Sequence, residues 1–127
     1  MRNAALVASG LLIVIAAFQI ALALGMPARK IAWGGGYEGR LPTGLRVASA
    51  VAGFVIYPLV ALLVLEAGGV TEFDLVPDVG PVGMWVLTGL FAVAALLNFL
   101  SRSRLERIWG PMCLVISVCC GIVAASV

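Results

Sequence analysis

The sequence predicts an all-α integral membrane protein, a four-helix bundle with both termini on the outer side of the membrane. Hydrophobic residues make up 63% of the chain and charged residues 11%, whereas soluble proteins average about half and about a quarter. The apolar residues form four blocks, with expected spans of about 4–24, 47–65, 82–100 and 108–127. A helix needs about twenty residues to cross a hydrocarbon core of roughly 30 Å. Residues 1–127 are therefore expected to form a single transmembrane domain.

The first block admits a second interpretation. Arg2 precedes an apolar run that ends in small residues, as in a secretion signal. The run is longer than the roughly 7–15 residues of a typical signal core. We therefore expect an uncleaved first helix.

Boundary residues define the other helices. Thr43 offers a hydroxyl to cap the second helix, and Pro81 suits the first turn of the third. Pro58 lies inside the second block, where it is expected to bend the helix or free a carbonyl, as a packing kink rather than a hinge. Pro111 leaves the last block short. Either this helix begins near Leu105, which makes Pro111 a kink, or the C-terminal end stops within the interface.

Basic and acidic residues are concentrated in different connections between the predicted spans. The first holds Arg29, Lys30, Arg40 and Arg46 against Glu38, and the third holds Arg102, Arg104 and Arg107 against Glu106. The second holds Glu66, Glu72, Asp74 and Asp78 and no lysine or arginine. By the positive-inside rule, the first and third connections face the cytoplasm, so both termini face outward. Such a strong bias also predicts that any homo-oligomer is parallel, with all copies inserted in the same direction.

Two amides are expected at a similar depth, Gln19 near the inner end of the first helix and Asn98 near that of the third. With Arg46, Arg102 and Arg107 they predict a polar pocket that opens to the cytoplasm and binds an anionic lipid or substrate. Arginine suits this task because its planar guanidinium binds phosphate through two hydrogen bonds. In the alternative interpretation, the amides bond between helices, and the arginines set topology and touch anionic head groups.

Other candidate residues have simpler interpretations. Trp33 and Trp109 are expected at the cytoplasmic interface, where indole rings act as anchors. Cys113 and Cys120 belong to a stripe of small side chains typical of helix packing in lipid. No spacing indicates a metal site, and a redox role for these thiols and Cys119 stays open. The glycine-rich stretch "WGGGYEGRLPTG" lacks a nucleotide-binding pattern and indicates a flexible or re-entrant loop.

The segments "AWGGGYEGRLPTGLRVASAV" and "NFLSRSRLERIWGP" resemble those of a family of small four-helix bacterial membrane proteins with no assigned function. The resemblance implies the helix layout and no activity. Small multidrug transporters have a similar size, but they carry a glutamate in the middle of the first helix, where this chain has only Gln19.

Composition also limits the function. The chain has no histidine, which removes the commonest general base, and we expect no catalytic residue, cofactor or metal. A net charge of +2 does not indicate a nucleic-acid partner. We expect a non-catalytic protein of the bacterial inner (cytoplasmic) membrane that binds lipids with anionic head groups or serves as an accessory subunit of a larger membrane complex. The alternative is a small transporter or channel that acts as a parallel homo-oligomer on an anionic substrate.

Overall fold

The computed structural model describes residues 1–74, 76–101 and 103–127. Its elements, in order, are α1 (Arg2–Ala23), η1 (Trp33–Gly35), α2 (Thr43–Val51), η2 (Ala52–Ile56), α3 (Tyr57–Ala67), α4 (Gly80–Phe99), η3 (Glu106–Ile108) and α5 (Trp109–Ser126). The described ranges contain no strand. Segments α1, α2 to α3, α4, and η3 to α5 are each long and apolar enough to cross a membrane. The protein is therefore an all-α, multi-pass membrane bundle, as the sequence predicts.

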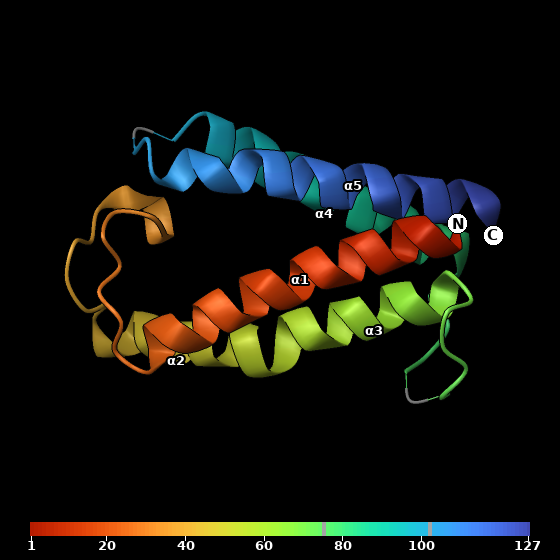
Figure 1. Cartoon of the computed structure of the whole chain (residues 1–127), viewed down its shortest axis with the longest axis horizontal. Coiled ribbons are helices and arrows are strands. Elements are labelled where there is room, and N and C mark those ends of the chain that lie inside the picture. Colours follow the sequence, from red (N-terminus) through yellow and green to blue (C-terminus); the bar gives the residue numbers. More distant parts are fainter. Residues whose placement is uncertain (75, 102) are drawn as a thin grey trace.

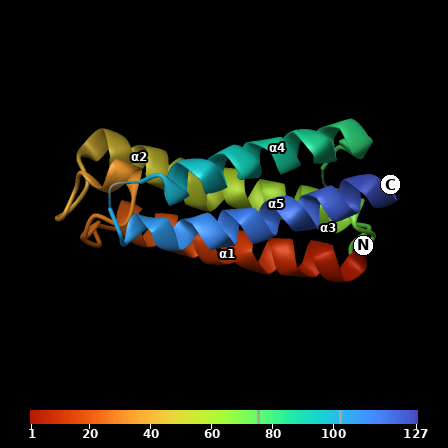
Figure 2. The same ribbon diagram turned by 90° about the horizontal axis from the view of Figure 1, so that it is seen from above.

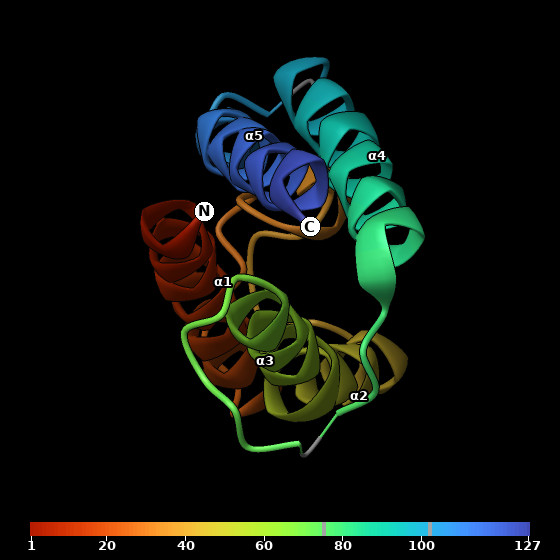
Figure 3. The same cartoon turned by 90° about the vertical axis from the view of Figure 1, so that its right-hand side faces the viewer.

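The helices pair into two hairpins (Figure 1). α1 packs on α2 and α3, α4 packs on α5, and α1 joins the two pairs by also packing on α5. Figure 2 shows that the helices follow one long axis and that both termini lie at the same end. Viewed along that axis, α4 lies on the outside, apart from most of the first hairpin (Figure 3).

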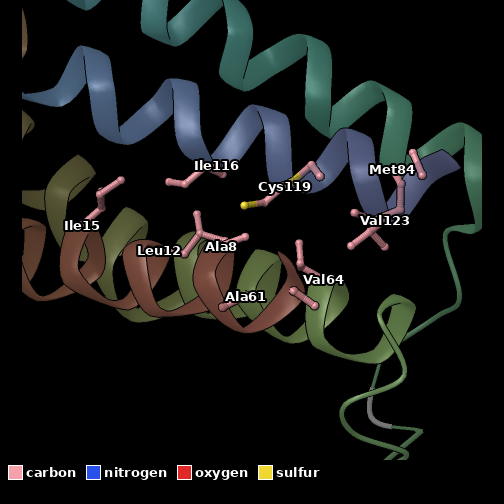
Figure 4. Packing of buried hydrophobic residues seen from close by; sticks show 12 residues of the cluster. Ala8, Leu12, Ile15, Ala61, Val64, Met84, Ile116, Cys119 and Val123 are labelled. Carbon is pink, nitrogen blue, oxygen red and sulfur yellow. The ribbon is translucent and has the colours of Figure 1, made fainter. Parts of the chain in front are cut away.

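The core lies where α1 meets α3 and α5. Figure 4 shows Leu12 of α1 together with Ile116 and Val123 of α5, and these side chains are almost completely buried. The helices approach closely because many of the other core residues are small, as the stripe containing Cys113 and Cys120 predicts. Small side chains of this kind at the core are Ala5, Ala8, Ala61, Cys120 and Ala124.

Two hydroxyls tie helices together inside this core. Ser9 Oγ of α1 donates a hydrogen bond of 3.2 Å to the carbonyl oxygen of Ala61 in α3. Ser117 Oγ of α5 donates one of 2.7 Å to the carbonyl oxygen of Thr88 in α4. Each bond satisfies a hydroxyl that hydrocarbon would leave without a partner.

The second span contains a π-helical turn, η2, just before Pro58. Proline has no N–H, and its ring clashes with the carbonyl four residues earlier, here that of Phe54. The chain widens for one turn, so that the Tyr57 N–H bonds to the carbonyl oxygen of Ala52. The expected disturbance at Pro58 therefore takes the form of a π-bulge. The widened turn brings Gly53 against α1.

Of the other predicted helix-boundary residues, some agree with the structure and one does not. Thr43 is already the first residue of α2, with Pro42 as the N-cap and no side-chain cap bond, so the predicted Thr43 cap is wrong. Pro81 lies in the first turn of α4, as predicted. The last span begins near Leu105 with η3, and Pro111 falls in the first turn of α5, where its missing N–H breaks no helical bond.

Gly53 tests the contact between the π-bulge and α1. A Cβ at this position would lie 2.6 Å from Ile20 Cγ1 and 2.8 Å from the Ala16 carbonyl oxygen. We expect Gly53→Ala to lower the free energy of unfolding by about 1–3 kcal/mol, because η2 and α1 must separate. Denaturant unfolding in detergent micelles measures the change.

Gly10→Ala is the matched control. No heavy atom lies within 4 Å of a Cβ there, and alanine is the better helix former. We expect unchanged or slightly higher stability. Equal losses in the two variants would contradict the close contact.

Candidate functional site

The two basic connections meet at one end of the bundle, opposite the termini (Figure 1). Ser103 Oγ in the third connection donates a hydrogen bond to the carbonyl oxygen of Lys30 in the first. Trp109 Nε1, at the start of α5, donates one of 2.7 Å to the carbonyl oxygen of Ile31. Gly35, with φ of +76°, lies so close to the third connection that a Cβ would come within 2.5 Å of Ser103 Cβ. The connections are thus docked on one another.

The first connection is a folded loop. Backbone N–H groups of Ala28, Arg29 and Lys30 donate to the carbonyl oxygens of Gly39, Glu38 and Tyr37, at 2.9, 2.8 and 2.7 Å. Buried Ala28, Ala32 and Leu41 pack with Leu22 at the end of α1. Trp33 Nε1 donates a 3.0 Å hydrogen bond to Ser49 Oγ of α2. This loop packs on the end of the bundle through its own hydrogen bonds, which the sequence interpretation as a flexible or re-entrant segment did not include.

The arginines of this end bind backbone carbonyls. Arg46 Nε donates a 3.1 Å hydrogen bond to the carbonyl oxygen of Ala23, the last residue of α1. Arg107 Nε donates one of 2.7 Å to the carbonyl oxygen of Ser101, just after α4. The Arg40 guanidinium lies over Gly25. Cations at helix C-termini satisfy free carbonyls and interact favourably with the helix dipole.

A cavity of about 140 Å³ lies between the hairpins near this end. α1 contributes Ile15, Phe18 and Gln19, α4 contributes Phe91, Ala94 and Asn98, and the first connection contributes Ala32 and Trp33. Tyr57 of α3, Glu106 of η3, and Trp109 and Cys113 of α5 complete the wall. Phe18 and Trp109 form a tilted pair, with ring centroids 4.8 Å apart and an interplanar angle of 44°.

The two predicted amides lie in this wall. Asn98 Nδ2 donates a 2.8 Å hydrogen bond to the carbonyl oxygen of Ala94, one turn earlier in its own helix. Gln19 Oε1 is buried and accepts no hydrogen bond from the part of the chain that the structure describes. An unsatisfied buried acceptor costs about 1–3 kcal/mol, so this oxygen is a place where a bound donor would be stabilised.

The structure therefore brings together part of the predicted site. Gln19 and Asn98 share one cavity, and Trp33 and Trp109 line it as well. Arg46 and Arg107 bind carbonyls nearby and are not among the described residues of the wall. Arg102 lies outside the described residues. Whether these residues bind an anion stays a prediction.

Three aromatic wall residues, Phe18, Tyr57 and Phe91, were missed by the sequence interpretation, although a periodic signal exists for Phe91. Phe91, Ala94 and Asn98 follow one another at helical spacing, as do Ile15, Phe18 and Gln19. Asn98 therefore shares a helix face with Phe91, and Gln19 shares one with Ile15, next to Phe18. Tyr57 has no such signal, because its place in the wall depends on the π-bulge before it.

A second hollow of about 430 Å³ lies at the opposite end, around the second connection. Its wall includes Glu66, Glu72, Asp74 and Asp78. Asp78 Oδ1 accepts a 2.9 Å hydrogen bond from the Gly80 N–H at the start of α4. Among the described residues, no three acidic, cysteine or histidine side chains are grouped as metal ligands.

Comparison with protein-family models, with curated proteins and with solved structures finds no match to this chain.

Gly35 tests the docking of the two connections. We expect Gly35→Ala to undock them, because alanine strains a backbone with positive φ and its Cβ would clash with Ser103. A loss of about 1 kcal/mol or more would speed amide hydrogen exchange at residues 28–39 about fivefold. Hydrogen exchange read by mass spectrometry measures this.

The neighbouring Gly36→Ala serves as the control, since no heavy atom lies within 4 Å of a Cβ there. Its exchange should match that of the parent. Unchanged exchange in Gly35→Ala would show that the two connections do not depend on this contact.

Proposed function

We propose that this chain is a non-catalytic membrane protein that binds phospholipid at its basic end, by itself or as an accessory subunit of a larger membrane complex. The observation that carries the proposal is the gathering of cations from two separate connections at one end of the bundle. The described cations there are Arg29, Lys30, Arg40, Arg46, Arg104 and Arg107. Each cation near an anionic membrane surface contributes about 1 kcal/mol to the attraction.

The proposed orientation places this end in the cytoplasm of a bacterium, with the protein in the inner membrane and both termini outside. The positive-inside rule supports it. The acids Glu66, Glu72, Asp74 and Asp78 lie toward the other end, with the termini (Figure 1). Apart from Arg2, Glu38 and Glu106, the described cations and acids are therefore separated along the bundle axis, which supports a fixed orientation in a membrane.

The exposed side of α4 supports a role in contacts within the membrane. Leu90, Val93 and Leu97 are each more than half exposed. α4 packs chiefly on α5, so its remaining surface is free for lipid chains or for a partner helix. Such a surface suits an accessory subunit.

A small transporter or channel is the second candidate. The cavity between the hairpins favours it, because transported molecules bind between movable helical units. In this proposal a parallel homo-oligomer moves an anionic substrate past Gln19 and Asn98.

Lipid binding is tested with the Lys30→Gln, Arg104→Gln double variant, which removes two exposed cations from the basic end. We expect its adducts with phosphatidylglycerol to be about tenfold or more weaker, as follows from about 1 kcal/mol per cation. Native mass spectrometry from phosphatidylglycerol nanodiscs measures adducts and stoichiometry together.

Arg2→Gln is the matched control, because it removes a cation at the opposite end. Its adducts should equal those of the parent. Equal losses would show that the charge, and not its location, governs binding. A defined homo-oligomer without lipid would instead favour the transporter.

The orientation is tested by labelling. A membrane-impermeant maleimide should label Asp74→Cys from outside, because Asp74 is an exposed residue of the acidic connection. The parent should stay unlabelled, since Cys113, Cys119 and Cys120 are buried. Labelling of Asp74→Cys from the cytoplasmic side alone would reverse the proposed orientation.

A further inference from the structure

The cavity between the hairpins has an unusual concentration of aromatic residues. The chain contains 3 tryptophans, 2 tyrosines and 5 phenylalanines. Half of these ten residues line this one space: Phe18, Trp33, Tyr57, Phe91 and Trp109. Aromatic π faces attract organic cations, most strongly where water is excluded.

The indoles cannot serve as hydrogen-bond donors to a ligand. The N–H of Trp33 already bonds to Ser49 Oγ, and the N–H of Trp109 bonds to the Ile31 carbonyl oxygen. What these two residues offer the cavity is therefore π surface. An anionic ligand would find no donor in either ring.

The remaining polar groups supply acceptors. Gln19 Oε1 is buried and lacks a partner within the described residues. Asn98 uses its Nδ2 on the Ala94 carbonyl oxygen, which leaves its amide oxygen as the acceptor of this wall residue. Glu106 adds a carboxylate to the lining. Acceptors and π faces together suit a ligand that is positively charged and carries N–H donors.

The volume sets the size of that ligand. A cavity of about 150 Å³ holds a benzene-sized molecule, whereas drug-sized ligands occupy about 300 Å³ or more. At about 140 Å³, this cavity accommodates an ethylammonium group and not a whole lipid or drug.

We infer that the cavity binds a protonated alkylammonium group, supplied by the head group of an aminophospholipid. The inference rests on the proposed lipid binding and names the part of the lipid that enters. The ammonium donates a hydrogen bond to Gln19 Oε1 and lies among the aromatic rings. The adjoining phosphate then remains outside the cavity, toward the cations of the basic end. A free lipophilic amine has the same ammonium chemistry and is the other source.

The ligand class is tested by titration. Trp85 lies outside the cavity wall, so in a Trp85→Phe background the fluorescence of Trp33 and Trp109 reports on the site. Ethylammonium chloride should change this emission in a saturable way, whereas sodium chloride of equal ionic strength should not. Tetramethylammonium, which has no N–H, should bind at least threefold more weakly. Equal binding of the two cations would overturn the role of Gln19, and no ethylammonium response would overturn the inference.

Substitutions of cavity residues test whether ethylammonium binds in this cavity. Gln19→Leu should weaken ethylammonium binding about tenfold, as for loss of a hydrogen bond to a charged donor. It should fold at least as well as the parent, because it removes a buried unpaired oxygen. Phe91→Leu should weaken binding about threefold. Phe54→Leu is its matched control, since Phe54 is largely exposed and lies outside the wall. Equal effects of Phe91→Leu and Phe54→Leu would overturn the placement.

An experiment in lipid nanodiscs distinguishes an aminophospholipid from a free amine as the source of the ammonium group. It also distinguishes failure of this inference from failure of the proposed function. From an equal mixture of phosphatidylethanolamine, phosphatidylcholine and phosphatidylglycerol, native mass spectrometry should show enrichment of phosphatidylethanolamine adducts that Gln19→Leu abolishes. Ethylammonium binding without that enrichment would identify a free amine as the ligand and overturn the lipid source. Phosphatidylglycerol adducts without any ammonium response would leave the proposed function standing and overturn this inference.

Discussion

Hydrogen bonds from two indole N–H groups hold the first connection between the two hairpins. Trp33 bonds to Ser49 of α2, and Trp109 of α5 bonds back to the Ile31 carbonyl oxygen. One loop is thereby fixed to both halves of the bundle at the same end. These two part-buried bonds link the first connection to both hairpins. Both tryptophans also line the cavity between the hairpins.

The cations at this end of the bundle have two roles, since some bind helix-end carbonyl oxygens and some are exposed. Arg46 and Arg107 bind carbonyl oxygens at or just beyond helix ends, while Arg29, Lys30 and Arg104 are exposed. Arg46 and Arg107 thus complete helix ends, and Arg29, Lys30, Arg104 and Arg107 face the surroundings. In the proposed function, a phospholipid contacts Arg29, Lys30 and Arg104 while Arg46 keeps its carbonyl partner. The aromatic cavity lies just inside this charged layer, which is the arrangement that a zwitterionic head group would use.

Packing is uneven across the bundle. Gly53 in the π-bulge brings the second span against α1, and small residues bring α1 close to α5. α4 is held by α5 on one side and exposes Leu90, Val93 and Leu97 on another. In water such a surface would be unfavourable, but lipid chains solvate it at little cost. The open side of α4 is therefore compatible with a stable bundle in a membrane.

The sequence by itself determined the class of fold, the four spans and the separation of cations from acids, because span length and charge position depend on the bilayer and not on neighbouring helices. It also placed Gln19 and Asn98 at one depth. Tertiary structure decided the rest of the site. Phe91 shares a helix face with Asn98, and Phe18 lies next to Gln19, but only the packing of α1, α4 and α5 brings these residues together around one cavity. Tyr57 joins them through the π-bulge. The arginines turned toward carbonyls because unpaired helix ends lay within reach, and this competition between partners depends on three-dimensional distances that a linear pattern does not contain.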